Sequence, residues 1–274
     1  MKTLLTIALL LLQSAGMIAS QRIVSIGGIC TETLYALGKG SSVVAVDATS
    51  THPSAVTSLP NLGYFGRIDA EAVLALKPTH VAMIAEADAR GLSARLRAAG
   101  IRVVVVAMPD TPDQTAEAIR SIGTFVGEGA AAASLATKTL ADVKKVEPFA
   151  SSPAVLSLYI RGTKTLLVNG TDTGVDGLLR RINARNVASV KGALPLTAEA
   201  VVAMKPDYIV VTKNGVASVG GVDGVLSLPG IAATPAGKAR RIVVLDDALL
   251  LTMGPRLGEA LQELRASLLK AGAR

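Results

Sequence analysis

A segment of this sequence recurs once, 128 residues further along the chain. Residues 70–84 (AEAVLALKPTHVAMI) align without gaps with residues 198–212 (AEAVVAMKPDYIVVT), with seven identities in fifteen positions. A solenoid would repeat many times, at a period of about 20 to 50 residues. A single recurrence at about half the chain length instead indicates a duplicated unit, so we expect two similar lobes.

In both halves, short runs rich in Val and Ile alternate with segments of helical length and apolar spacing. The predicted strands lie at residues 22–25, 43–47, 80–85, 102–107, 154–159, 208–212 and 241–245. The predicted helices of the first half lie at residues 31–37, 70–76, 91–99 and 112–126. This alternation predicts an α/β fold in which parallel strands carry helices on both faces.

Residues 128–150 separate the two halves. Their first part, 128–147, is rich in Ala, Leu, Lys and Glu, which favour helix, and residues 149–153 would end that helix. At a rise of 1.5 Å per residue, such a helix spans roughly 30 Å, about the width of a small lobe. We therefore expect a first lobe at residues 21–127, a single long connecting helix at 128–150 and a second lobe at 151–274.

The first twenty residues have the pattern of a secretory signal. Lys2 provides a positive start, residues 4–12 are mostly Leu, Ile and Ala, and small residues lead up to Ser20. The alternative is a membrane anchor, but the apolar run is shorter than the roughly 18 residues needed to span a bilayer. We expect an exported protein whose signal peptide is cleaved near Ser20.

Composition and motifs argue against several classes of protein. Cys30 is the only cysteine, so it forms no disulfide within the chain, and we expect it to be a small buried side chain. Aromatic residues make up 3% of the chain and the net charge of +7 is scattered, so we expect no nucleic-acid partner. The common nucleotide-binding, hydrolase and zinc-protease motifs do not occur, and we expect no enzyme.

Taken together, these features resemble the helix-linked class of periplasmic solute-binding proteins that supply ABC importers. Several stretches resemble, in particular, the haemin-binding component of haem importers: residues 22–28 (RIVSIGG) with 31–38 (TETLYALG), 43–53 (VVAVDATSTHP), 59–78 (LPNLGYFGRIDAEAVLALKP), 218–237 (SVGGVDGVLSLPGIAATPAG) and 246–261 (DDALLLTMGPRLGEAL). The resemblance implies a periplasmic protein that captures haem in a cleft between its lobes. Its partners would be a permease dimer with ATPase subunits and, upstream, an outer-membrane haem receptor system.

Tyr64 differs from the other three tyrosines in its sequence context. It lies in a loop between Gly63 and Gly66, whereas tyrosines 35, 159 and 208 lie in or beside predicted helices and strands, where core packing accounts for them. A loop tyrosine can simply pack its own turn. The resemblance implies more, because haem-binding relatives place their iron-ligating tyrosine at this position, and a phenolate is a hard anion that suits ferric haem.

The resemblance also suggests side chains that would help Tyr64. Arg67 would stabilise the phenolate or pair with a haem propionate, although relatives often carry the basic residue one position earlier, where this chain has Gly66. His52 is a candidate second iron ligand, or the ligand of a second haem; a solvated loop histidine is the alternative. Lys213 and Arg256 are candidate propionate contacts, although exposed lysines and arginines are common without any such role.

Glu71 and Glu199 occupy equivalent positions of the repeat, in the first turn of two predicted helices that Asp69 and Thr197 would cap. An acidic side chain there interacts favourably with the helix dipole and needs no partner. The resemblance implies a docking role, because one glutamate on each lobe of such binding proteins meets arginines of the permease.

Two other functions stay open from the residues alone. The same fold binds ferric siderophores or corrinoids in other proteins, and the ligand depends on the cleft and not on the fold. An exported α/β enzyme is the third hypothesis.

Overall fold

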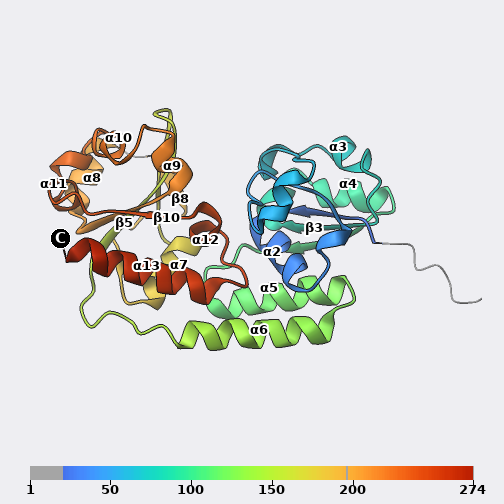
Figure 1. Cartoon of the computed structure of the whole chain (residues 1–274). Helices are drawn as coiled ribbons and strands as arrows, with labels where there is room; N and C mark the ends of the chain where they lie inside the picture. The colour runs from blue at the N-terminus through green and yellow to red at the C-terminus, as the bar shows by residue number, and fades with distance from the viewer. Residues whose placement is uncertain (1–20, 196, 274) are drawn as a thin grey trace, which may run out of the picture.

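The computed structural model describes residues 21–195 and 197–273. The predicted signal peptide and its cleavage site near Ser20 lie outside the described residues. Within the described residues, no helix is long and apolar enough to cross a bilayer. Figure 1 shows two lobes side by side, with two antiparallel helices running beneath them.

The first lobe is built on a parallel sheet with strand order β2-β1-β3-β4. Its strands are β1 (Ile23–Ile26), β2 (Val43–Val46), β3 (His80–Ile84) and β4 (Arg102–Val106). Its helices are α2 (Gly28–Ala36), α3 (Ala70–Leu74), α4 (Leu92–Ala98) and α5 (Pro112–Phe125). Every residue of β1 and β3 is buried, as expected for central strands covered on both faces.

The second lobe is built on a sheet with strand order β10-β9-β5-β6-β8, and β7 also pairs with β5. Its strands are β5 (Ala154–Arg161), β6 (Thr165–Asn169), β7 (Arg185–Asn186), β8 (Ala193–Pro195), β9 (Tyr208–Thr212) and β10 (Ile242–Leu245). Its helices are α7 (Gly174–Arg181), α8 (Ala198–Met204), α9 (Lys213–Ala217), α10 (Val222–Leu226), α11 (Pro235–Lys238), α12 (Asp247–Leu251) and α13 (Leu257–Gly272).

The second sheet is mixed, so the expectation of parallel strands throughout is wrong for this lobe. Strands β5 and β6 form an antiparallel hairpin, and β8 continues it in antiparallel pairing with β6. The hairpin turn contains Gly162 at a φ of 63°, a backbone conformation that glycine adopts without strain. The duplicated segment itself occurs as α3–β3 in one lobe and α8–β9 in the other.

The lobes are joined by helix α6 (Gly129–Lys144), which packs against α5 of the first lobe and α13 of the second (Figure 1). Two glycines allow these close approaches. A Cβ on Gly123 would lie 2.1 Å from the Ala132 Cβ, and one on Gly258 would lie 2.7 Å from the Asp142 Cβ. The helix ends at Lys144 and not at 150: the Lys145 and Val146 amides donate to carbonyls three residues back, and Pro148 then keeps the helix from resuming. The two lobes and their connecting helix confirm the predicted α/β architecture.

The lobes also touch each other at the base of the space between them. Arg256, before α13, makes two hydrogen-bonded contacts to the Glu32 carboxylate of α2, at 2.8 and 3.1 Å. The Thr115 hydroxyl of α5 donates to the Met253 carbonyl at 3.1 Å. These contacts link residues far apart in the sequence and hold the orientation of one lobe on the other.

Candidate ligand-binding cleft

A cavity of about 530 Å³ lies between the lobes and is lined by residues of both. On the first lobe, the lining includes Thr49 after β2, Glu86 after β3 and Met108 after β4. On the second lobe, it includes Asn214 after β9 and Asp247 after β10. The carboxyl ends of parallel strands thus converge on the cavity, which is the usual ligand site of open α/β sheets.

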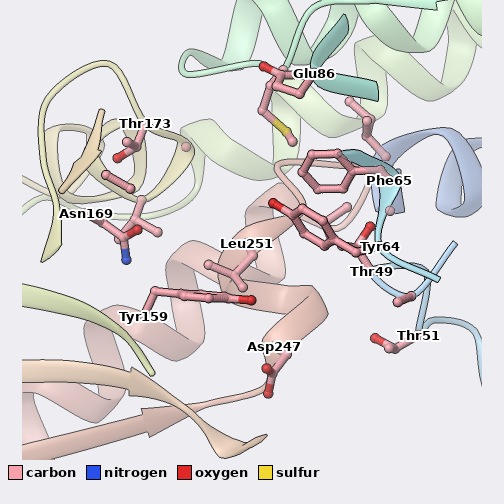
Figure 2. A pocket seen from close by; sticks show the side chains of 18 of the residues that line it. Thr49, Thr51, Tyr64, Phe65, Glu86, Tyr159, Asn169, Thr173, Asp247 and Leu251 are labelled. Atoms are coloured by element: carbon pink, nitrogen blue, oxygen red, sulfur yellow. The ribbon is translucent and has the colours of Figure 1, made fainter. Parts of the chain in front are cut away.

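Tyr64 projects into this cavity from the loop that precedes a short 3-10 helix, η3 (Phe65–Arg67) (Figure 2). Its ring packs on Phe65, with 4.1 Å between the ring centroids, and half of its surface stays exposed. The loop is held at both ends. The Leu62 amide donates to the Val46 carbonyl at 2.9 Å, and the Arg90 guanidinium donates to the Gly66 carbonyl at 2.8 Å.

The environment of Tyr64 keeps its phenol neutral in the absence of a ligand. Partial burial raises the pKa of Tyr64, and Tyr159, Asp47 and Glu86 raise it further. Asp47 is buried, and its carboxylate accepts hydrogen bonds from the Gly27 amide and the Thr49 hydroxyl, so its charge is fixed close to the cleft. A phenolate at Tyr64 therefore requires positive charge from a ligand.

A second tyrosine faces the same cavity from the other lobe. Tyr159 lies near the end of β5, and Figure 2 shows its phenol and that of Tyr64 projecting into a common space. The Arg161 guanidinium carbon lies 4.6 Å from the centroid of the Tyr159 ring. Arg161 also pairs with Asp247 at 2.9 Å. The prediction that Tyr159 packs in the core is therefore wrong. The end of β5, where Tyr159 lies, extends past the covered part of the sheet.

The burial along β5 shows why sequence reasoning missed this pair. Ala154 to Leu158 are all buried, whereas Tyr159 and Arg161 are half-buried at alternate positions around the buried Ile160. A strand that changes from continuous to alternating burial is leaving the covered core. The outward positions then carry the side chains available to a ligand.

The other predicted haem contacts do not line the cavity. Arg67 and Lys213 are exposed, and neither is among the residues around the cavity. His52 is half-buried and is likewise outside the lining. Arg256 is engaged by Glu32 beneath the cleft. The structure thus brings together Tyr64 and the unpredicted Tyr159 and Arg161.

The two predicted docking glutamates lie on the surface, at the starts of α3 and α8. Glu71 is exposed, and a backbone hydrogen bond, followed by the pair with Arg95 at 2.6 Å, lowers the pKa of Glu71. Glu199 is also exposed. Thr197 caps α8 by accepting the Ala200 amide at 3.3 Å, as predicted. Asp69 occupies the equivalent cap position of α3 but makes no capping hydrogen bond, so that prediction is wrong.

The family of the chain follows from a match along most of its length. A family model described as periplasmic binding protein matches residues 23–249. The chain belongs to the periplasmic binding protein family. This membership confirms the prediction of a solute-binding protein rather than an enzyme. A relative from Bacillus subtilis, an uncharacterized ABC transporter substrate-binding lipoprotein, is 31% identical over 259 residues, covering 90% of this chain and 80% of the relative.

Solved structures of this family are more similar still. The chain is 39% identical to the periplasmic heme-binding protein RhuT from Roseiflexus sp. RS-1, with a TM-score of 0.88, covering 92% of this chain and 99% of that one. It is 33% identical to the periplasmic heme-binding protein BhuT, with a TM-score of 0.83 and the same coverage. A vitamin B12-binding protein from Pectobacterium carotovorum is more distant, at 26% identity over 183 residues and 66% of each chain.

Proposed function

We propose that this protein captures haem in the periplasm and delivers it to the permease of an ABC importer. One observation carries the proposal: two tyrosines, one from each lobe, face a single cavity of about 530 Å³. Phenolate oxygen is a suitable axial ligand for ferric haem. The similarity to solved heme-binding proteins along more than nine-tenths of the chain supports the same ligand class.

In this proposal, Tyr64 is an axial ligand of the ferric iron. Its pKa is raised in the ligand-free protein, so the phenol proton leaves only when the ferric ion supplies a compensating positive charge. Arg67 was expected to help, but its side chain is exposed and outside the cavity lining. The iron itself must then stabilise the Tyr64 phenolate.

Tyr159 is the proposed second ligand, in the role first considered for His52. Its oxygen faces the cavity from the opposite lobe, and Arg161 lies over its ring at 4.6 Å. This cation–π contact holds the Tyr159 ring in place beside the cavity. Ligation by both lobes would also favour the closed arrangement of the cleft.

Titration of the mature protein with ferric haemin, followed by its visible spectrum, tests the proposal. Tyr64→Phe and Tyr159→Phe each delete one oxygen and keep the ring, so each should change the spectrum of bound haemin. We expect the Tyr64 variant to bind at least about tenfold more weakly, equivalent to roughly 1.4 kcal/mol. Wild-type spectra and affinities in both variants would overturn the assignment.

Tyr208→Phe is the matched control. Tyr208 is also a strand residue of the second lobe with an arginine over its ring, Arg241 at 5.6 Å, but it does not line the cavity. Its substitution should leave haemin binding unchanged. Cobalamin and a ferric hydroxamate siderophore complete the series, because the vitamin B12-binding relative makes a corrinoid the second candidate. Tighter binding of cobalamin than of haemin would favour that candidate.

We also propose that Glu71 and Glu199 dock the protein on its permease. Both are exposed and stand at equivalent places on the two lobes. The pair between Glu71 and Arg95 is no obstacle, because exposed ion pairs contribute only about 0.2–1 kcal/mol and a permease arginine can replace Arg95. Two separated carboxylates can engage both halves of a two-fold permease, which sets orientation.

The Glu71→Arg/Glu199→Arg double variant tests the docking proposal in an importer reconstituted in vesicles. It should bind haemin as the wild type does but fail to stimulate ATP hydrolysis. The Glu117→Arg/Glu147→Arg double variant, which changes two other exposed acids, is the charge-matched control. Undiminished stimulation by the double variant would rule out docking through these residues.

A further inference from the structure

Four charged side chains line the cleft within the described residues, and three of them are acidic. They are Glu86 from the first lobe and Asp172, Asp247 and Arg161 from the second. A ligand that carries carboxylates, as haem does, would therefore meet more negative than positive charge inside the cavity. The question is whether Arg161 is available to such a ligand.

Arg161 is committed to Asp247. Its guanidinium pairs with one Asp247 oxygen at 2.9 Å, and the other oxygen accepts the Asn214 amide at 3.0 Å. The Asp247 side chain is only 12% exposed. If Arg161 turned to a ligand carboxylate, it would leave a buried carboxylate without its counter-charge, which is unfavourable. A ligand carboxylate therefore gains little from Arg161.

The two remaining acids repel a ligand carboxylate from the interior. Asp172 pairs with Lys191 at 3.3 Å, but the two side chains are 57% and 85% exposed, so water screens both charges and the pair leaves no net positive charge for a ligand carboxylate. Glu86 is exposed and has no ion-pair partner within the described residues. Exposed cations, by contrast, lie outside the cavity lining, at Arg67 and Lys213. Because the described lining holds no cation other than Arg161, negative groups of a ligand are less favoured inside the cavity than in the water outside it.

We infer that the cleft recognises a metalloporphyrin by its iron and its apolar ring, and leaves both porphyrin carboxylates in water at the mouth. The inference rests on the proposed function and deepens it. At the mouth, an exposed ion pair changes affinity by no more than about fivefold. The substrate class is then wider than haem itself, and includes iron porphyrins whose carboxylates are esterified.

The experiment compares three porphyrins under one detergent condition: ferric haemin, its dimethyl ester, and metal-free protoporphyrin IX. We expect the dimethyl ester to bind within about fivefold of haemin, and the metal-free porphyrin at least about tenfold more weakly than haemin. A dimethyl ester that binds tenfold or more weakly than haemin would overturn the inference. So would a metal-free porphyrin that binds as tightly as haemin.

Glu86→Gln provides a second and independent readout. It removes the unpaired acid from the lining and keeps the shape of the side chain. Glu86 also raises the pKa of Tyr64, so both porphyrins should bind somewhat more tightly to the variant, but haemin, whose carboxylates Glu86 repels, should gain a few-fold more than the dimethyl ester. An equal change for both porphyrins would contradict the inference. Failure of haemin to bind the wild type would instead refute the proposed function, so the two failures are distinguishable.

Discussion

The ion pair between Glu32 and Arg256 should matter to stability mainly when one partner is removed. The pair joins the two lobes, and the side chains of Glu32 and Arg256 are 4% and 22% exposed. Removal of one partner leaves the other charge poorly hydrated, whereas removal of both leaves an apolar contact. We therefore predict that Glu32→Leu and Arg256→Met are each destabilising, and that the double variant is no worse than either.

The size of the effect follows from the burial of the pair. Loss of one partner of a buried ion pair costs about 3–5 kcal/mol. In the Glu32→Leu variant, Arg256 keeps partial access to water and a second acidic partner, Glu259, at 3.8 Å. The loss of unfolding free energy should therefore lie at the lower end of this range, at about 3 kcal/mol. For a chain of this size, 3 kcal/mol lowers the melting temperature by about 6–12 °C. The coupling energy between the two sites should then be at least about 3 kcal/mol.

The pH dependence gives a second signature. Burial raises the pKa of Glu32, while Arg256 opposes that shift. A carboxyl with a raised native pKa holds more protons in the native state than in the unfolded state between the two pKa values. Its contribution to stability therefore decreases as the pH rises through that interval. Arg256→Met removes the opposing charge, so its destabilisation should be greater at about pH 8 than at about pH 5.

Urea unfolding of the ligand-free protein at both pH values measures these effects. The exposed pair of Asp223 and Arg240 provides the control, because its side chains are 83% and 60% exposed. The corresponding changes, Asp223→Leu and Arg240→Met, should each cost less than about 1 kcal/mol. The reasoning is refuted if the Glu32 variant costs as little as these controls, or if the double variant costs the sum of the two single ones.

Two further predictions concern protons. Because binding through the Tyr64 phenolate releases a proton from a phenol of raised pKa, haemin affinity should rise by up to about tenfold per pH unit between about pH 5.5 and 7.5. An affinity independent of pH, or the same slope in Tyr64→Phe, would count against phenolate ligation. Burial lowers the pKa of His80, so the unfolded state binds more protons and stability should decrease as the pH falls through about 6.5. His80→Phe keeps the edge-on contact with Phe125 and should flatten that slope in urea unfolding; parallel profiles would contradict it.

Much of the fold followed from local patterns in the sequence. The seven predicted strands coincide with β1 to β5, β9 and β10 within two residues at each end. The ungapped repeat predicted two lobes, and both copies fold as a helix followed by a largely buried strand. Such strands can be predicted from a short stretch of sequence. A strand that is buried on both faces requires a continuous apolar run, wherever it lies in the sheet.

Tyr64 was also within reach of the sequence. Glycines on both sides of Phe65 and Tyr64 indicate a loop, and a loop after a strand of a parallel sheet lies at the edge where ligands bind. The position of Tyr159 in the cleft could not be predicted from the sequence, because Tyr159 lies in an apolar run that is typical of a buried strand. Its exposure depends on how far β5 extends beyond the helices that cover it, which is a property of the packed lobe.

The charges show most clearly what only the tertiary structure decided. Glu32 and Arg256 are 224 positions apart, and Arg161 and Asp247 are 86 positions apart. Apolar periodicity predicts which face of each element is buried, because the hydrophobic effect is non-directional and requires only that apolar side chains leave water. It does not predict which charged side chain meets which, because a salt bridge requires a specific distance and orientation. For Arg161 and Asp247 that geometry arises when β5 and α12 pack within the second lobe, and for Glu32 and Arg256 it arises only when α6 and α13 pack together and set one lobe against the other.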